Sequence, residues 1–341
     1  MMKYAYYILG ILVGLGIGWG KGIIHFSRLR SVLTVFFLFL GTTLAIISPI
    51  AGTFNDLIRA NLQGEKILPW VLVPPQGVNV QDSTVQDISG QRVKAVLNHT
   101  FNAVMANSIQ KTTLIKAHTK SNEEVEITDY ITAPPIILPH IPSLGEKARI
   151  MFFHVPLAWI GFIAYVITMI FSIRFLIAKS DYHDRVAYSS AYVGTAFTVL
   201  AYLSGAIWAR FNWGHFFNWD MRELSVLLLL LIYAGYFILR SNITNEQIQQ
   251  RISATYATIA GIAAAFLIFI LPRLTISLHP GSKDDTTIGP ILSPQQDALD
   301  VTKAVIFSLM LAGFSLLFTW LLSIVTRYML LKKRLDSTNH A

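Results

Sequence analysis

The residues with the clearest chemical potential form one aromatic stretch. Residues 208–222 hold three of the chain's seven tryptophans, two adjacent phenylalanines and a closing acid and base, namely Trp208, Trp213, Phe216, Phe217, Trp219, Asp220 and Arg222. A flat shelf of rings suits a large planar apolar ligand, and an acid and a base can orient the polar groups of such a ligand. His215 in the same stretch is interpreted as an exposed loop residue rather than as a further ligand.

Two other histidines stand far apart in the sequence. His154 lies at the start of a long apolar run, and His279 precedes Pro280 and Gly281, a pair that would hold a turn. Neutral imidazole is the commonest metal ligand among side chains. Taken alone, either histidine is as readily explained by a hydrogen bond to a backbone carbonyl as by metal binding. The placement of the two histidines relative to the aromatic stretch decides between these interpretations.

The composition indicates a membrane protein. Of 341 residues, 53% are hydrophobic and 13% are charged, whereas a soluble chain carries about 25% charged residues. There is no cysteine, which excludes disulfides, thiolate metal sites, a cysteine nucleophile and a C-x-x-C-H motif. The formal net charge of +8 is too diffuse to indicate binding to nucleic acid.

Seven stretches are candidates for membrane spans, for which about 20 apolar residues are needed. They are 4–20, 31–50, 151–178, 186–208, 223–240, 253–272 and 302–327. The first is short and rich in glycine, and its small residues would permit close helix packing. We interpret it as a retained helix, because no small-x-small cleavage pattern follows it. The predicted fold class is therefore all-α, a polytopic transmembrane bundle of six core helices plus one N-terminal helix.

The spans divide the chain into five expected regions. They are an extra N-terminal helix with a cytoplasmic loop (1–30), a first core helix (31–50), an insert (51–150), the helical core (151–330) and a tail (331–341). The insert has a soluble-like composition. Alternation over 124–131 predicts a strand, and 100–109 is expected to form a short helix. We interpret 51–150 as a small mixed extracytoplasmic insert.

Lys and Arg in the short loops predict the orientation of the chain. More of them lie on the side that holds the C-terminus, which is therefore predicted to be cytoplasmic. The aromatic stretch and both histidines then share the outer face. Two imidazoles that approach a planar ligand from opposite sides give the geometry of six-coordinate haem iron. Outer arginines would pair with the haem propionates, the candidates being Arg149, Arg210, Arg222 and Arg273.

Three sequence blocks resemble the haem-handling CcmC family of the cytochrome c maturation pathway. They are 145–159 around His154, 205–222 with Trp213 and Gly214, and 277–282 around His279, in the family's order. The resemblance covers about 150–330 and includes segment 31–50 as the family's first helix. It implies that His154 and His279 are the axial ligands of a transiently bound haem b, and that 208–222, Gly214 included, contacts the porphyrin.

The resemblance also implies a function without catalysis. Members of the family display haem at the outer face of the bacterial inner membrane and pass it to a periplasmic haem chaperone. The implied partners are ABC-transporter subunits, a small helical subunit and membrane lipid, with no nucleic acid.

The sequence departs from the family pattern in three places, and these departures leave alternatives open. Phe216 and Phe217 replace paired tryptophans, which keeps stacking area and loses the indole N–H donors. The insert 51–150 and the helix 4–20 are additional. The insert raises the alternative of a CcsA-like subunit of a cytochrome c haem lyase, which attaches haem to apocytochrome c. A further alternative is an interaction subunit whose aromatic stretch docks a protein and never binds haem.

Overall fold

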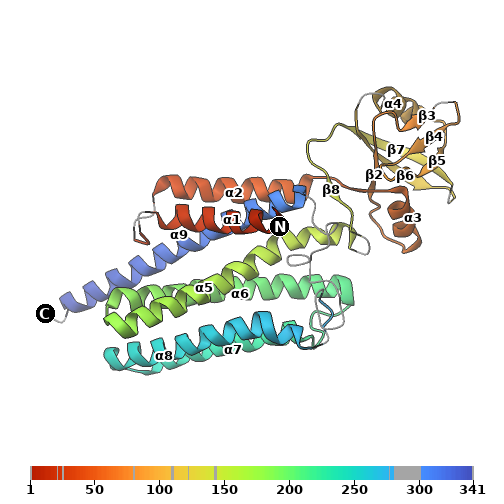
Figure 1. Cartoon of the computed structure of the whole chain (residues 1–341). Coiled ribbons are helices and arrows are strands. Elements are labelled where there is room, and N and C mark those ends of the chain that lie inside the picture. The colour runs from red at the N-terminus through yellow and green to blue at the C-terminus, as the bar shows by residue number, and fades with distance from the viewer. Residues whose placement is uncertain are drawn as a thin grey trace. The chain divides into compact units, whose positions relative to one another are not determined.

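The computed structural model describes residues 2–20, 22–24, 27–79, 81–108, 111–121, 123–141, 144–275, 277–279 and 301–339. The chain divides into two compact units, and each is described by itself (Figure 1). One is helical and comprises the chain up to residue 42 and from residue 150 onward. The other comprises residues 43–149 and contains all the strands.

Seven long helices build the first unit. They are α1 (Met2–Trp19), α2 (Arg28–Ile47), α5 (Met151–Ala178), α6 (Asp181–Trp213), α7 (Met221–Asn242), α8 (Glu246–Ala265) and α9 (Val301–Asn339). A π-helical turn, Phe266–Ile270, and a 3-10 turn, Leu271–Arg273, continue α8. Among the described residues six helices are long and apolar enough to cross a membrane, which confirms the predicted polytopic bundle. The apolar part of α1, Ala5–Trp19, forms a helix but falls short of that length.

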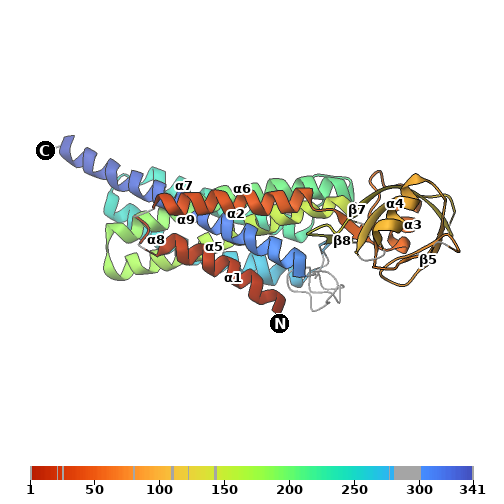
Figure 2. The ribbon, with the colours of Figure 1, turned by 90° about the horizontal axis from the view of Figure 1, so that it is seen from above.

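The glycines of α1 let it approach α9 closely. A Cβ added to Gly10 would lie 2.6 Å from the carbonyl oxygen of Ser308, and one added to Gly14 would lie 2.6 Å from that of Ala312. Gly18, one further turn along, lies against the side chain of Thr319. Figures 1 and 2 both show the two helices side by side. This packing confirms the expectation drawn from the small residues.

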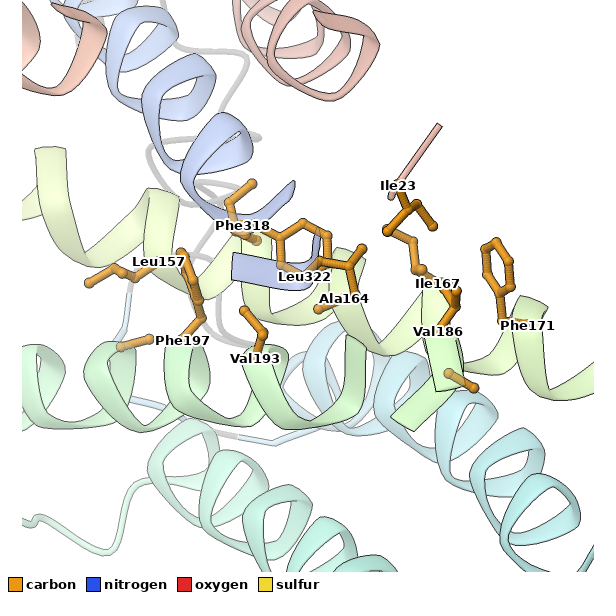
Figure 3. Close-up of a cluster of buried hydrophobic side chains, with 13 residues drawn as sticks. Ile23, Leu157, Ala164, Ile167, Phe171, Val186, Val193, Phe197, Phe318 and Leu322 are labelled. Atoms are coloured by element: carbon orange, nitrogen blue, oxygen red, sulfur yellow. The ribbon is translucent and has the colours of Figure 1, made fainter. Parts of the chain in front are cut away.

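Helices α5, α6 and α9 enclose the main apolar core of this unit. Side chains from all three meet in Figure 3, among them Leu157, Ala164 and Ile167 of α5, Val193 and Phe197 of α6, and Phe318 and Leu322 of α9. In α5 the buried positions recur every three or four residues, which is the spacing of one helix face. The shared core fixes α5 against α6, the two helices that carry the site described below.

Two helices run further than the sequence pattern predicted. The span expected to end at residue 208 continues as α6 to Trp213, because no helix-breaking residue occurs before Gly214. Gly214 takes a φ of +87° and its N–H donates to the carbonyl of Arg210 at 3.2 Å. Trp208 and Trp213 therefore both lie on the last turns of α6, and Trp213 lies beyond the predicted end of the span. Likewise α9 continues through 331–339, part of the expected tail.

The second unit is an eight-stranded sheet with two helices. The strands are β1 (Ile50–Gly52), β2 (Trp70–Val73), β3 (Val78–Asn79), β4 (Thr84–Gln86), β5 (Arg92–Ala95), β6 (Thr113–Thr119), β7 (Glu124–Thr132) and β8 (Leu138–Pro139), in the order β3-β4-β5-β7-β6-β2-β1-β8. The helices are α3 (Phe54–Leu62) and α4 (His99–Ser108). The strand predicted at 124–131 and the helix predicted at 100–109 correspond to β7 and α4, with residue 109 outside the described part.

Helix α3 packs on this sheet through Phe54 and Leu57, which are fully buried. A capping box begins the helix, since Thr53 accepts from the N–H of Asp56 and the Asp56 carboxylate accepts from that of Thr53. The same carboxylate has Oδ1 3.5 Å from Nδ1 of His140. Asp56 therefore joins the start of α3 to the chain beyond β8.

Candidate functional site

One cavity of the helical unit brings the two histidines together. It has a volume of about 180 Å³ and is lined by parts of α5, α6, α7, the turns after α8 and residue 279. The lining side chains that could bind or stack on a ligand include His154, Tyr202, Phe216, Arg222, Glu223 and His279. Four of these were predicted from sequence, whereas Tyr202 and Glu223 were not.

The imidazole of His154 is held by α6. Its Nδ1 lies 3.0 Å from the carbonyl oxygen of Ala201 and 3.2 Å from Oγ of Ser204. A carbonyl only accepts, so Nδ1 carries the proton and the lone pair of Nε2 remains for a metal. Gly205 leaves room for the ring, since a Cβ there would lie 2.8 Å from Cε1 of His154.

The imidazole of His279 is held by Asp220 and by two tryptophans. Nδ1 of His279 lies 3.3 Å from Oδ1 of Asp220. The centroid of the His279 ring lies 5.1 Å from that of Trp213 and 6.0 Å from that of Trp208, and the two indoles meet edge to face. The carboxylate at Nδ1 again leaves Nε2 as the nitrogen available to a metal. The turn expected at Pro280 and Gly281 lies outside the described residues.

Asp220 links the start of α7 to residues 277–279. Its carboxylate accepts from Oγ of Ser277 at 2.7 Å, from the N–H of Leu278 at 2.7 Å and from that of Arg222 at 2.9 Å. Burial raises the pKa of Asp220, but the contacts with His279, Ser277 and Leu278 outweigh it and hold the pKa well below its usual range. The group is thus an anion held by protein partners, and its role in orienting a ligand stays a prediction.

The loop between α6 and α7 is fixed by a carboxylate that sequence reasoning missed. Glu223 accepts from the N–H of Asn218 at 2.7 Å. Trp219, next in the chain, has a φ of +55°, a strained value for a residue with a side chain, and the anchors on either side hold it there. The spacing Asp220-x-x-Glu223 resembles a capping box at a helix start, and this signal could have identified Glu223.

The aromatic residues of the loop separate into two groups. Phe216 lines the cavity and lies under the guanidinium of Arg210, whose carbon is 5.8 Å from the ring centroid. Phe217 and Trp219 pack on each other with ring centroids 5.0 Å apart, and the Trp219 side chain is 77% exposed. The structure therefore places Trp208 and Trp213 against His279 and Phe216 at the cavity, whereas Phe217 and Trp219 pack on each other.

The arginines expected near the site differ in their surroundings. Arg222 lines the cavity, and Arg273 is exposed at the end of the turns after α8. Arg149 belongs to the other unit, where it pairs with Glu146 and donates to the carbonyl of Ala45 at 2.8 Å. Among the described residues no cluster of three or more His, Cys, Asp or Glu exists that would hold a metal ion by itself.

Comparisons with known proteins identify the family. A model of the family "Heme exporter protein C" matches residues 131–341, more than half of the chain. The chain belongs to the heme exporter protein C family. The CcmC-type resemblance recognised in the sequence is thereby confirmed, and the family consists of haem transport components of cytochrome c biogenesis, not of enzymes.

Curated relatives of the heme exporter protein C family support the assignment. The protein of that name from Bradyrhizobium diazoefficiens is 29% identical over 57% of this chain and 70% of its own length. The one from Paracoccus denitrificans is 28% identical over 58% of this chain and 80% of its own length. A cytochrome c biogenesis protein CcsA from Welwitschia mirabilis is 37% identical, but over only 17% of this chain. The chain is thus a multi-pass membrane protein with a role in haem delivery for cytochrome c maturation.

Proposed function

We propose that the cavity binds the iron of haem b between His154 and His279 and presents the haem for transfer. The observation that carries this proposal is that both imidazoles line one cavity while each has Nδ1 engaged by the protein. This arrangement leaves two Nε2 lone pairs for the two axial positions of iron. The family supplies the ligand class, and the donor set of two imidazoles fits it.

Other residues around the cavity fit an amphipathic ring with carboxylates. Trp208 packs against His279, and its indole N–H is buried and donates to no acceptor among the described residues, which leaves it as a candidate donor for a ligand carboxylate. Arg222 lines the cavity and supplies a positive charge. Phe216 and Trp213 offer ring faces and edges for stacking.

The size of the cavity favours transfer over storage. A volume of about 180 Å³ is below the roughly 300–1,000 Å³ of pockets that enclose a drug-sized ligand. Haem would therefore be covered along one edge, and the uncovered edge would remain accessible to an acceptor. We propose a periplasmic haem chaperone as that acceptor, and ABC-transporter subunits and a small helical subunit as partners in the membrane.

The proposal includes an orientation. The excess of Lys and Arg on the side of the C-terminus supports a cytoplasmic C-terminus and a haem site at the periplasmic face of the inner membrane. On this orientation 51–150 is extracytoplasmic.

The test is the absorption spectrum of the full chain, purified in detergent and titrated with haem. The wild type should show a six-coordinate low-spin spectrum, and His154→Ala and His279→Ala should each lose it. His118→Ala, an exposed histidine of β6, is the matched control and should behave as the wild type. His215→Ala shows whether the loop histidine takes part. Retention of the six-coordinate spectrum by both cavity variants would refute the axial assignment.

A haem lyase function remains the second candidate, because a short segment is similar to CcsA. Reconstitution with haem and an apocytochrome c discriminates between the two. Thioether formation would favour the lyase, whereas transfer of haem without a new covalent bond to the apocytochrome would favour the carrier.

A further inference from the structure

A second cavity lies between α5 and α8, toward the opposite end of α5 from His154. Its volume is about 550 Å³. It is lined by Leu176, close to the last residue of α5, and by the first half of α8, whereas His154 stands on the first turn of α5. The two helices are in contact, since Gly261 of α8 faces the side chain of Met169 of α5. We refer to this cavity as the α5–α8 groove.

The wall of the α5–α8 groove is a continuous apolar stripe. Ile248, Ile252 and Ile259 recur at intervals of four and seven residues, which places them on one face of α8. Their side chains are 51%, 43% and 64% exposed. Leu176 faces them from α5. The stripe therefore runs along the axis of α8, as a bound hydrocarbon chain would.

Two polar side chains of the wall already have hydrogen-bond partners within the protein, and Arg251 is a further polar residue of the wall. The hydroxyl of Thr255 donates to the carbonyl of Arg251 at 3.0 Å, and that of Tyr256 donates to the carbonyl of Ile232 at 2.8 Å. Arg251 is the one charged residue among those that line the groove, and it is exposed. The groove therefore combines a hydrocarbon-like wall with a single cation.

No acid of the wall competes for this cation. Glu246, two residues before Ile248, pairs instead with Arg185 at 2.7 Å and with Lys333 at 3.0 Å. It does not line the groove. An amphipathic anion with one charged head and a long apolar tail matches a wall of this kind, since basic pockets between transmembrane helices bind anionic head groups.

We propose that the α5–α8 groove binds an anionic phospholipid, with its phosphate on Arg251 and one acyl chain along Ile248, Ile252 and Ile259. The lipid comes from the membrane leaflet at this end of the helices, which is the leaflet opposite the histidine cavity. Bound there, it fills the interval between the ends of α5 and α8. The site is separate from the histidine cavity and does not depend on haem binding.

The experiment uses the full chain in nanodiscs that contain equal amounts of phosphatidylglycerol and phosphatidylcholine, followed by release in the gas phase and native mass spectrometry. The wild type should retain phosphatidylglycerol in preference to phosphatidylcholine. Arg251→Gln should lower that retention about fivefold, the effect expected for one cation at an anionic lipid surface. Arg174→Gln is the matched control, because Arg174 is an exposed cation of α5 that lies over the Phe171 ring and does not line the groove. It should retain lipid as the wild type does.

A second variant tests the apolar wall. Ile252→Trp fills the groove and should displace both phospholipids, while thermal unfolding of the same sample confirms that the chain is folded. Three results would overturn the proposal. The first is that the wild type shows no preference for phosphatidylglycerol. The second is an equal loss of phosphatidylglycerol retention in Arg251→Gln and Arg174→Gln, which would indicate diffuse surface charge. The third is displacement of the lipid by one equivalent of haem, which would make the groove a haem site.

Discussion

The carboxylate of Asp220 and the imidazole of His279 face each other at 3.3 Å between Oδ1 and Nδ1. Asp220 is itself buried and held as an anion by Ser277 and Leu278. A carboxylate behind a ligating histidine fixes the ring and increases the electron density of the nitrogen that binds the metal. The contact also joins the start of α7 to residues 277–279, so one side chain both tethers these residues and orients the His279 imidazole.

The first prediction concerns this pair. Asp220→Asn keeps the size of the side chain and the cap of α7, but removes the negative charge behind His279. Haem affinity should fall about 10–100-fold, as for other changes behind a metal ligand, and the midpoint potential of bound haem should rise, because a less electron-rich imidazole stabilises ferric iron less. A haem titration and a spectroelectrochemical titration measure the two effects. Ser277→Ala, which leaves the carboxylate facing His279, should change both less; equal effects would assign Asp220 a purely structural role.

The second prediction concerns the room behind His154. A Cβ at position 205 would lie 2.8 Å from Cε1 of His154, so Gly205→Ala must displace the imidazole ring. We expect a mixture of five- and six-coordinate haem in the absorption spectrum, with unchanged secondary structure in circular dichroism. Gly16→Ala is the matched control, because nothing lies within 4 Å of the added Cβ there. A six-coordinate spectrum in both variants would show that the ring of His154 is free to move.

The third prediction concerns a buried ion pair at the other end of the bundle. Arg240 of α7 donates to Oδ1 of Asp184 of α6 at 2.8 Å, and its guanidinium lies over the ring of Tyr188. Arg240→Gln leaves a carboxylate buried without its partner, which should cost about 3–5 kcal/mol. Arg185→Gln removes a pair whose Glu246 partner is 48% exposed and should cost at most about 1 kcal/mol. Thermal unfolding in detergent compares them, and equal melting temperatures would show that the Asp184 pair contributes little.

The fourth prediction concerns acid stability in the unit 43–149. The contact with His140 lowers the pKa of Asp56, burial raises it, and the hydrogen bonds with Thr53 lower it again. The net result is a pKa lowered from 3.8 to about 2. Because the folded pKa lies below the unfolded one, the stabilisation is complete above pH 4 and is lost as the pH falls from about 4 to about 2. Asp56→Asn should remove about 2 kcal/mol at neutral pH and should flatten this dependence.

Hydrogen exchange of the α3 amides in the full chain, corrected for the intrinsic effect of pH, follows this loss. Protection of α3 in the wild type should decrease between pH 4 and pH 2 and should change little in Asp56→Asn. The same slope in the two proteins would show that Asp56 is not the responsible group.

Much of this molecule is determined by local sequence. The apolar runs predict the six long helices, because a segment in hydrocarbon must satisfy its own backbone hydrogen bonds and so becomes helical wherever enough apolar residues follow one another. The glycines of α1 predicted close packing, and the alternation at 124–131 predicted β7. The two histidines and the aromatic stretch also stand out by residue type alone, and the family comparison agrees with their order.

The tertiary structure decided which residues face one another. The sequence ended the span at residue 208, whereas α6 continues to Trp213 and both indoles pack against His279. Asp220 is directed at His279, and nothing in the residues around position 220 encodes a partner near position 279. Such contacts arise only when separate helices pack on a common core, because a hydrogen bond is stronger in the buried interior and forms between the polar groups that the packing brings together. Local sequence therefore predicts the helices and the types of residue at the site, whereas the packing of α5, α6 and α7 decides which ring nitrogen of each histidine the protein engages.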